Sequence, residues 1–284
     1  MKKNIYVKNI RDSIIYHFFC ILLGLLMLYP VVWMVLAAFK DQNDIFGHTL
    51  KLLPSVWRFE NFAEGWQGMG GYTFATFFKN SIVISVVATV GCMASSSFVG
   101  FGFARNRFYL RNFWFACMLS TMMLPYQMVM IPQYIIFHKM KLVGSIWPII
   151  IPVALGTPFF IFMMTQFMRG IPKELDESAV IDGCSKFGIY WRIFLPLSKS
   201  ALMTAAIFQF YWRWNDFVQP LIYLTKNKQW TVTVALRSFA DPTSVTNWGA
   251  MFAMSCLSII PVFLIFFLLQ RHITEGISTT GIKG

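Results

Sequence analysis

Long stretches without acidic or basic side chains are the feature that most constrains how this chain can fold. Five of them contain no Asp, Glu, Lys or Arg and run for 25 residues or more: residues 13–39, 80–104, 112–138, 142–168 and 242–270. A helix of 25 residues is about 37 Å long, which is enough to cross the ~30 Å hydrocarbon core of a bilayer. These stretches therefore predict membrane-spanning helices.

Composition argues against a soluble fold. Apolar residues make up 57% of the chain and charged residues 13%, whereas soluble proteins have roughly 45–50% and about 25%. The 30 Phe, 10 Trp and 10 Tyr residues carry more aromatic surface than one small soluble core can bury. The net charge of +12 comes from basic residues at the ends of apolar stretches, where they orient helices, and not from basic runs with interleaved aromatics. We expect an integral membrane protein that contacts membrane lipid and no nucleic acid.

A sixth apolar region, residues 200–225, is interrupted by Arg213 and Asp216. The chain is therefore predicted to be an all-α, polytopic membrane protein with six transmembrane helices. A single transmembrane domain is expected over residues 13–284, after a cytoplasmic N-terminus of residues 1–12. The predicted spans are about 13–39, 80–104, 112–137, 142–168, 200–225 and 245–270. The first span lacks a small-residue cleavage site and exceeds the apolar region of a signal peptide, so we expect it to be retained.

Six spans place both termini on the same side of the membrane. The short loop 105–111 has three arginines and no acid, and Lys and Arg are in excess on the face that this loop shares with the termini. Because loops rich in Lys and Arg stay in the cytoplasm, both termini are predicted to be cytoplasmic and residues 40–79 to lie outside.

Two patterns indicate that some spans are bent or closely packed. Prolines crowd the third and fourth spans, where each removes a backbone donor and favours a kink: Pro125, Pro132, Pro148, Pro152 and Pro158. Small residues on the second span form a face that another helix can approach closely: Gly91, Ser95, Ser96, Gly100 and Ala104. Helix packing is one explanation of this face, and contact with a transported molecule is the other.

Motifs for catalysis and metal binding are missing from the sequence. It contains no H-E-x-x-H zinc motif, no G-x-x-x-x-G-K-[ST] phosphate loop and no G-x-S-x-G nucleophile elbow. The four histidines and five cysteines are scattered singly, without metal-ligand spacing. We expect no catalytic residue, no metal site and no cofactor bound by this chain. The expected function is transport and not catalysis.

Charged residues inside the fifth span are the main candidates for a polar site. Arg213 and Asp216 stand at positions i and i+3, so on a helix they share a face and can pair. Charges within a bilayer favour a bundle interior or a water-lined position. Trp212, Trp214 and Asn215 surround the pair. The group is either a polar station on a translocation path, with aromatic rings available to stack on sugars, or a structural ion pair between helices.

The loop 169–199 differs from the other loops because its charged and apolar residues follow an order typical of two short helices. Pro172 can begin a helix, and acids near its positive dipole end favour the first turn: Glu174, Asp176 and Glu177. Gly183 permits a left-handed turn. The segment 184–194 then offers an apolar stripe: Phe187, Tyr190, Trp191 and Phe194. We interpret the loop as a helix–turn–helix that inserts into a partner's groove; an amphipathic hairpin lying on lipid is the alternative.

This loop resembles the E-A-A-x3-G-x9-I-x-L-P signature of ABC importer permeases. The matching residues are Glu177-Ser178-Ala179, Gly183 and Ile193-x-Leu195-Pro196, at the same spacing. Over about residues 73–284 the chain also resembles the shorter, six-helix subunit of maltose-type carbohydrate importers. The segments that carry this resemblance are G-F-G-F-A-R-N-R-F (100–108), M-L-P-Y-Q-M-V-M-I-P (123–132), F-M-R-G-I-P-K-E-L (167–175), W-N-D-F-V-Q-P-L (214–221) and E-G-I-S-T-T-G-I-K-G (275–284).

The resemblance implies that the loop contains a coupling helix, which docks into a cleft on a cytoplasmic ATPase. The residues it implies in ATPase coupling are Glu177, Ser178, Ala179, Asp182, Gly183, Ile193, Leu195 and Pro196. Ser178 and Cys184 replace usual alanines with residues of similar size, and Ser200 replaces a frequent proline, so we expect a less sharply bent start of the fifth helix. The W-N-D-F segment borders the translocation route in the family. The substrate-path candidates are Trp212, Arg213, Trp214, Asn215 and Asp216.

The resemblance also implies a multisubunit, ATP-driven importer in the cytoplasmic membrane of a prokaryote. Its other parts would be a second related permease, a dimer of ABC ATPases that uses ATP and Mg, and an extracytoplasmic sugar-binding protein. The cargo would be a carbohydrate, in the first place an oligosaccharide, with a glycerol phosphate or polyol ester as the alternative. Outer aromatic residues would meet the binding protein or lie at the membrane interface: Trp57, Trp66 and Tyr72. An ion-coupled secondary transporter, with Arg213 and Asp216 as its coupling site, is the competing interpretation.

Overall fold

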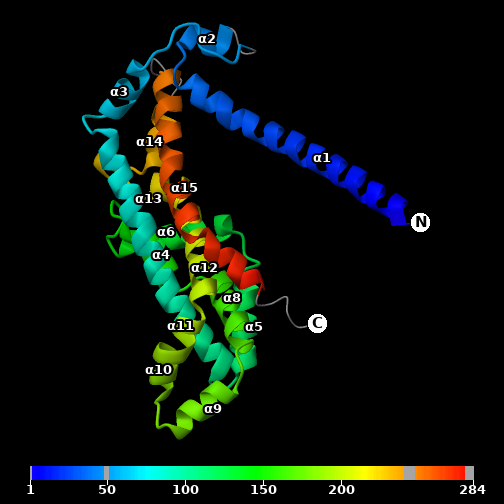
Figure 1. Ribbon diagram of the computed structural model, residues 1–284. Coiled ribbons are helices and arrows are strands. Elements are labelled where there is room, and N and C mark those ends of the chain that lie inside the picture. The colour runs from blue at the N-terminus through cyan, green and yellow to red at the C-terminus, as the bar shows by residue number, and fades with distance from the viewer. Residues whose placement is uncertain (1, 48–50, 240–246, 279–284) are drawn as a thin grey trace. The chain divides into compact units, whose positions relative to one another are not determined.

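The computed structural model describes residues 2–47, 51–239 and 247–278, with side chains between Asp12 and Arg271. In these ranges it contains helices and no strand, apart from an isolated bridge between Met69 and Tyr72 (Figure 1). The α-helices are α1 (Lys2–Ala37), α2 (Gln42–Gly47), α3 (Glu60–Gln67), α4 (Phe74–Arg105), α5 (Arg111–Thr121), α6 (Tyr126–Lys139), α7 (Trp147–Ala154), α8 (Pro158–Arg169), α9 (Glu174–Ile181), α10 (Lys186–Ile189), α11 (Leu195–Leu197), α12 (Lys199–Trp214), α13 (Val218–Tyr223), α14 (Val232–Phe239) and α15 (Trp248–Ser278). A π-helix, η1 (Tyr190–Phe194), and a 3-10 helix, η2 (Asn227–Gln229), complete the elements. The all-α prediction is confirmed.

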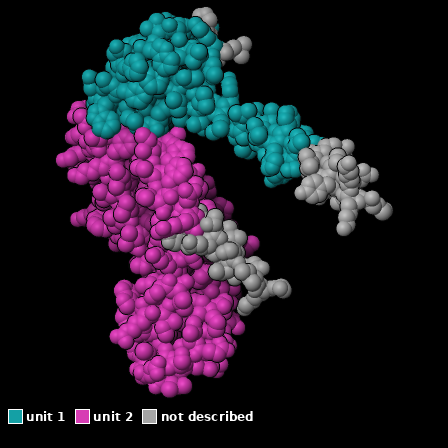
Figure 2. Space-filling view, in the orientation of Figure 1, with its two compact units in different colours: residues 1–67, 236–257 teal, residues 68–235, 258–284 magenta. Residues whose placement is uncertain are grey.

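Two compact units divide the chain (Figure 2). Unit 1 comprises residues 1–67 and 236–257, and unit 2 comprises residues 68–235 and 258–284. The helix α15 contributes residues to both units. All residues that the sequence suggests for coupling or for the substrate path belong to unit 2.

Candidate membrane spans match the predicted number when each bent helix pair is taken as one span. Four segments are long and apolar enough to cross a bilayer by themselves: Asp12–Ala37, Phe74–Arg105, Trp147–Arg169 and Trp248–Arg271. Two further pairs qualify together, and each is bent at a short break: Arg111–Thr121 with Tyr126–Lys139, by 98°, and Lys186–Leu197 with Lys199–Trp214, by 74°. The described residues therefore provide up to six spans.

Breaks within three predicted spans correct their expected boundaries. The third span is not one helix, because α5 ends at Thr121 and α6 starts only after Pro125, whose ring cannot continue a helical hydrogen-bond ladder. The fourth span starts at Trp147 rather than 142 and is interrupted at Gly156, which has a φ of +114°. The fifth does not run from 200 to 225, since α12 stops at Trp214.

The second bend lies at the start of the fifth predicted span, close to Ser200. The chain turns by 74° where α11 meets α12. Ser198 stands between the two helices and is fully buried. Pro196, which lacks a backbone N–H, already lies in the short helix α11, so the bend does not require a second proline.

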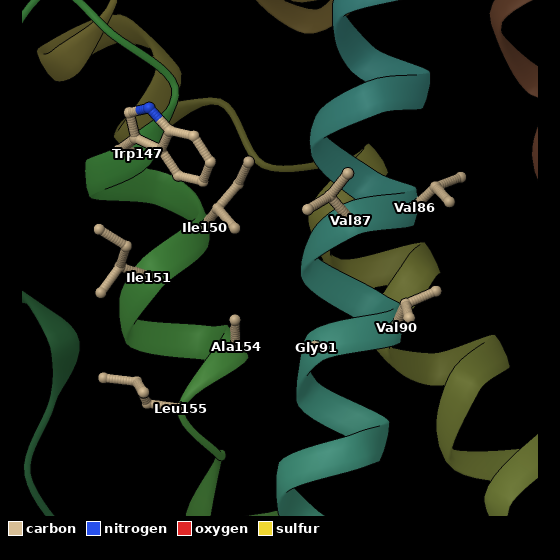
Figure 3. A pocket seen from close by; sticks show the side chains of 9 residues that line it. All are labelled: Val86, Val87, Val90, Gly91, Trp147, Ile150, Ile151, Ala154 and Leu155. Carbon is tan, nitrogen blue, oxygen red and sulfur yellow. The ribbon is translucent and has the colours of Figure 1, made fainter.

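Unit 2 is organised around α4, which packs against α7, α8 and α12. Its small residues lie at the closest approaches. A Cβ built on Gly91 would meet the Cβ of Ala154 in α7 at 2.6 Å, and one built on Gly100 would meet the Cβ of Met164 in α8 at 2.8 Å. Figure 3 shows Gly91 facing Ala154 across the two helices. The packing interpretation of the small-residue face is therefore confirmed for these two glycines.

An apolar groove of about 500 Å³ follows the contact between α4 and α7 (Figure 3). Its lining is almost entirely hydrocarbon, with one indole ring, and consists of Val86, Val87, Val90, Gly91, Trp147, Ile150, Ile151, Ala154 and Leu155. Apart from the indole N–H of Trp147, no lining side chain carries a hydrogen-bonding group, so the groove is suited to hydrocarbon.

Unit 1 contains α1 and part of the outer loop that the sequence predicts at residues 40–79. The ring of Phe39 packs against Trp57, Phe59 and Phe62, with centroid distances of 5.5, 5.3 and 5.2 Å. Asn61 donates to the carbonyl oxygens of two residues just after α1, Ala38 and Lys40. In contrast, the apolar residues of α1 from Ile14 to Tyr29 are almost all exposed. This helix face requires lipid or another chain to cover it.

Candidate functional site

The predicted coupling loop forms α9 at the end of unit 2 where α4 ends (Figure 1). Three acids occupy the first turn of α9, where they interact favourably with the helix dipole: Glu174, Asp176 and Glu177. Ala179 faces inward and is buried, whereas Glu177, Ser178 and Asp182 are exposed. Val180 and Ile181 also face outward, and Ile181 is 86% exposed. The outer face of α9 therefore presents exposed apolar side chains beside exposed acidic ones.

Local backbone hydrogen bonds end α9. Gly183 has a φ of +77°, which is the left-handed conformation expected from the sequence. Its N–H donates to the carbonyl of Val180 at 3.0 Å, and the N–H of Cys184 donates to the carbonyl of Ala179 at 2.9 Å. These two bonds form a Schellman motif. No atom lies within 4 Å of the position a Cβ would take on Gly183, so the space above this turn is open.

The second half of the loop departs from the expected single stripe. The rings of Tyr190 and Phe194 turn inward against Phe101 of α4, with centroid distances of 5.4 and 5.1 Å. Phe187 and Trp191 are exposed and stack on each other at 6.4 Å. The stripe is thus half buried and half exposed, and Phe187 and Trp191 still contact the ring of Tyr190, with centroid distances of 6.4 and 6.3 Å.

Interactions at both ends position this second half. Ser185 caps α10 by accepting a hydrogen bond from the N–H of Gly188 at 3.2 Å. The hydroxyl of Tyr190 forms a hydrogen bond with that of Ser97 in α4 at 2.8 Å. Of the remaining signature residues, Ile193 and Leu195 are half-buried and Pro196 is exposed. The signature residues therefore lie on one continuous loop, with Ala179 on its inner side and Glu177 and Gly183 on its outer side.

Arg105 is a residue of this site that the sequence marks only as one of three basic residues in loop 105–111. Its guanidinium contacts the end of α8, the connection to α9 and α9 itself. Nothing in the sequence distinguishes it from Arg107 and Arg111, because the three have the same charge and lie in the same loop. The distinction is burial, since the Arg105 side chain is 7% exposed and Arg107 is exposed.

The second candidate site lies at the break between α12 and α13. Arg213 Nη1 lies 3.1 Å from Asp216 Oδ2, and the two side chains are only 14% and 13% exposed. Arg213 Nη1 also donates to Gln219 Oε1 at 2.7 Å, and the Gln219 N–H donates to Asp216 Oδ1 at 3.3 Å. The predicted pairing is confirmed, but its expected location on one helix is wrong. Asp216 follows the end of α12, so the pair spans a helix terminus.

Two other helices contribute polar groups to this cluster, which we call the Arg213 cluster: Arg213, Asp216, Gln219, Tyr126 and Thr233. Tyr126, the first residue of α6, has a buried hydroxyl on which the charges of Asp216 and Arg213 act. Thr233 of α14 donates to the carbonyl of Asp216 at 2.7 Å. Arg213 Nε is buried and has no hydrogen-bond partner in the part of the chain that the structure describes. The Tyr126 hydroxyl is also buried without such a partner, so the cluster keeps two donors available among the described residues.

The other substrate-path candidates do not join this cluster. Trp214 is buried, stacks on Phe210 and donates from Nε1 to the carbonyl of Ser258 at 2.9 Å. Trp212 packs against the rings of Phe159 and Phe160, and Asn215 donates to the carbonyl of Tyr211. Tyr126, Gln219 and Thr233 were not among the predicted candidates. Gln219 lies inside the segment W-N-D-F-V-Q-P-L (214–221) and Tyr126 inside M-L-P-Y-Q-M-V-M-I-P (123–132), and these resemblances were the sequence signals for them.

Metal ligands do not assemble in either site. Among the side chains that the structure describes, in residues 12–47, 51–239 and 247–271, no group of three or more His, Cys, Asp and Glu is placed to hold a metal ion.

Comparisons with known proteins all match membrane components of transport systems. A family model described as "Binding-protein-dependent transport system inner membrane component" matches residues 96–279, which include α9 and the Arg213 cluster. The "Probable ABC transporter permease protein YurM" of Bacillus subtilis (strain 168) is 34% identical over 90% of this chain and 84% of that protein. The "Arabinooligosaccharides transport system permease protein AraQ" of Halalkalibacterium halodurans is 33% identical over 92% of this chain and 93% of that protein.

A solved structure shows the same fold. It is a bacterial ABC transporter involved in the import of the acidic polysaccharide alginate, and the matching chain superposes with a TM-score of 0.79. The match covers 92% of this chain and 96% of that chain at 22% identity. The likeness therefore extends over nearly the whole length of both chains.

Proposed function

The chain belongs to the family of binding-protein-dependent transport system inner membrane components, and from that premise we propose that it is half of the membrane path of an ATP-driven oligosaccharide importer. Its relatives are ABC transporter permeases, and named examples carry arabinooligosaccharides and diacetylchitobiose. These relatives support an importer and not the ion-coupled secondary transporter. In this proposal ATP and Mg act on a separate ATPase dimer, and a second related permease and a sugar-binding protein complete the assembly.

The observation that carries the proposal is the outer face of α9. It combines an acid at Glu177, the exposed apolar side chain of Ile181 and an open space above Gly183. A cytoplasmic loop has no lipid to cover an exposed isoleucine, so a protein groove is the fitting partner. We assign this face to the ATPase. Both termini are then cytoplasmic, because the termini and this loop lie on the same side of a six-span chain.

We further propose that the Arg213 cluster borders the sugar path. Arg213 Nε is a buried donor without a partner among the described residues, and the Tyr126 hydroxyl lies close by. Sugar hydroxyls accept and donate such hydrogen bonds. In this assignment Arg213 and Asp216 contact the carbohydrate, whereas Trp212, Trp214 and Asn215 shape the helix ends around them.

Substitution of Gly183 tests the coupling assignment. Gly183→Asp adds a charged side chain to the open space above the turn. Gly71→Asp is the matched control, since Gly71 has a φ of +81°, also has no atom within 4 Å of a Cβ, and lies outside the loop. The two variants share the strain of a left-handed non-glycine residue, roughly 1–2 kcal/mol. Only the first obstructs the proposed docking face.

We measure the amount of ATPase that co-purifies with the permease and the rate of uptake of labelled sugar, both normalised to permease abundance. We expect Gly183→Asp to lower both at least tenfold, which corresponds to about 1.4 kcal/mol of docking free energy, while Gly71→Asp retains both. Equal behaviour of the two variants would refute the docking assignment.

A further inference from the structure

Arg105 occupies a position where one side chain reaches several parts of the coupling loop. It is the last residue of α4, the central helix of unit 2. Its Nη2 donates to the carbonyl of Met168, in the last turn of α8, at 2.8 Å, and also to the carbonyl of Ile171. The carbonyls at a helix C-terminus lack helical partners and carry partial negative charge. A buried arginine therefore stabilises the end of α8 directly.

The same guanidinium contacts both halves of the loop. Its Nη1 lies 3.5 Å from Oδ2 of Asp176 on α9, and its Cζ lies 4.7 Å from the centre of the Phe194 ring in η1. Burial raises the pKa of Asp176, and the positive charge of Arg105 opposes that rise. This ion pair is a direct polar link between the end of α4 and α9, beside the apolar cluster that contains Phe101 and Ala179.

Only arginine has the geometry for this set of contacts. Two carbonyls, a carboxylate and an aromatic face surround one planar group, and the guanidinium presents five N–H donors in a rigid plane. A lysine ammonium keeps the charge but presents three donors from one atom, so it cannot hold the carbonyls and the carboxylate in the same arrangement. The charge of Arg105 and its shape can therefore be tested separately.

We infer that Arg105 is a positioning residue that fixes the angle between α9 and α4, so that displacement of α9 is transferred to the central helix. The inference rests on the proposed coupling role of α9. Arg105 does not itself form the docking face, because it is almost fully buried. Without the Arg105 side chain the ATPase stays attached to the permease, but less sugar is transported for each ATP that is hydrolysed.

The experiment compares Arg105→Lys, Arg105→Gln and Arg107→Gln in the complete importer reconstituted with its ATPase and binding protein. Arg107 is the matched control, since it lies in the same loop, carries the same charge and is exposed. The readouts are co-purified ATPase, ATP hydrolysis stimulated by the binding protein, and sugar transported per ATP hydrolysed. The ratio of transport to hydrolysis is not changed by a variant that merely folds less well.

We expect both Arg105 variants to retain the ATPase and to transport about tenfold less sugar per ATP, because hydrogen bonds to a charged group are lost. Arg107→Gln should resemble the unmodified protein. An Arg105→Lys variant with unchanged transport per ATP would overturn the inference, since charge alone would then suffice. Loss of the ATPase from the Arg105 variants would also overturn it, by placing Arg105 in the docking face.

Asp176→Asn keeps the inference testable if the Arg105 variants do not accumulate. The substitution removes the α9 end of the ion pair and also removes a partly buried carboxylate whose pKa burial has raised. Abundance should therefore stay the same or rise, while transport per ATP falls about threefold or more. Unchanged transport per ATP in this variant would overturn the link to α9. Failure of the docking assignment is seen separately, in the Gly183→Asp result.

Discussion

Two interruptions of helix in unit 2 present their side chains in opposite directions. At α9 the helix ends through its own backbone hydrogen bonds, and Ile181 faces outward beside an open turn. At the break after α12 the charged side chains of Arg213 and Asp216 face inward and are 14% and 13% exposed. The first arrangement suits a protein partner and the second a small polar molecule. Helix termination alone thus does not indicate function; the direction in which the terminus presents its side chains does.

The largest effect is expected when the inward-facing pair is broken. Arg213→Ala leaves the Asp216 carboxylate buried without its charge partner, and removal of one member of a buried pair costs roughly 3–5 kcal/mol. Membrane abundance of this variant should fall strongly. Arg58→Ala is the control, because the Arg58–Asp41 pair of unit 1 is short, at 2.6 Å, but both side chains are 39% exposed.

The double variant Arg213→Ala/Asp216→Ala decides which role the pair has. Abundance should recover, because no unpaired charge remains. If the pair borders the sugar path, uptake stays low despite normal abundance. Full uptake by the double variant would show that the pair only joins helices. The inward-facing charges would then contribute to stability, and they would not bind the transported molecule.

A smaller effect is expected when the inner side of α9 is overfilled. Ala179 is buried while the adjacent Ser178 is exposed. Ala179→Leu forces extra atoms into a packed contact, which costs about 1–3 kcal/mol, and should displace α9 and reduce uptake. Ser178→Leu adds the same side chain to the outer surface, and its effect reports on the docking face alone. Equal uptake and equal thermal stability for Ala179→Leu and the unmodified protein would contradict the inward position of Ala179.

A still smaller effect is expected for Tyr126→Phe. This substitution removes one hydroxyl from the Arg213 cluster and preserves the ring. Loss of one hydrogen bond changes affinity by about 0.5–1.5 kcal/mol. Half-saturating sugar concentration for uptake should rise by about 2- to 10-fold, with abundance unchanged. An unaltered concentration dependence would remove Tyr126 from the path.

The smallest effect is expected at the exposed pair of unit 1. The hydrogen bond from Arg58 is the main cause that lowers the pKa of Asp41 below its ordinary value of 3.8. A lowered folded-state pKa gives stability that is present above the unfolded value and is lost as the pH falls through the folded value. Asp41→Asn should therefore destabilise by about 0.2–1 kcal/mol at pH 7. Thermal unfolding should show this difference shrinking at acid pH and at high salt; a difference that persists in acid would mean another contact of Asp41 is responsible.

Features set by neighbouring residues in the chain were predictable from the sequence. The acids in the first turn of α9 and the left-handed Gly183 follow from short-range backbone and dipole effects, and both were expected. The spans followed from long uncharged stretches. The break at Pro125 was foreseeable in part, because the proline itself was recognised as a site of kinking.

Features set by distant residues were not predictable. The Tyr190 side chain turns inward because it contacts Ser97 and Phe101, which lie more than eighty residues earlier in the chain. The role of Arg105 depends on the carbonyls of Met168 and Ile171, which the chain brings to it only after α8 has packed on α4. The buried Arg105 and its exposed or half-exposed neighbours Arg107 and Arg111 are of the same residue type and lie in the same short stretch, so the local sequence does not separate them.

The Schellman motif that ends α9 has a consequence for the speed and strength of assembly. Because the N–H groups of Gly183 and Cys184 satisfy the carbonyls of Val180 and Ala179 without any partner chain, α9 is already formed before the docking that we propose. A preorganised ligand loses little conformational entropy on binding, so more of the contact free energy appears as affinity. The helix then acts as a rigid lever rather than as a segment that folds on contact. In the coupling role that we propose, displacement of the ATPase groove would then move α9 rather than unfold its end.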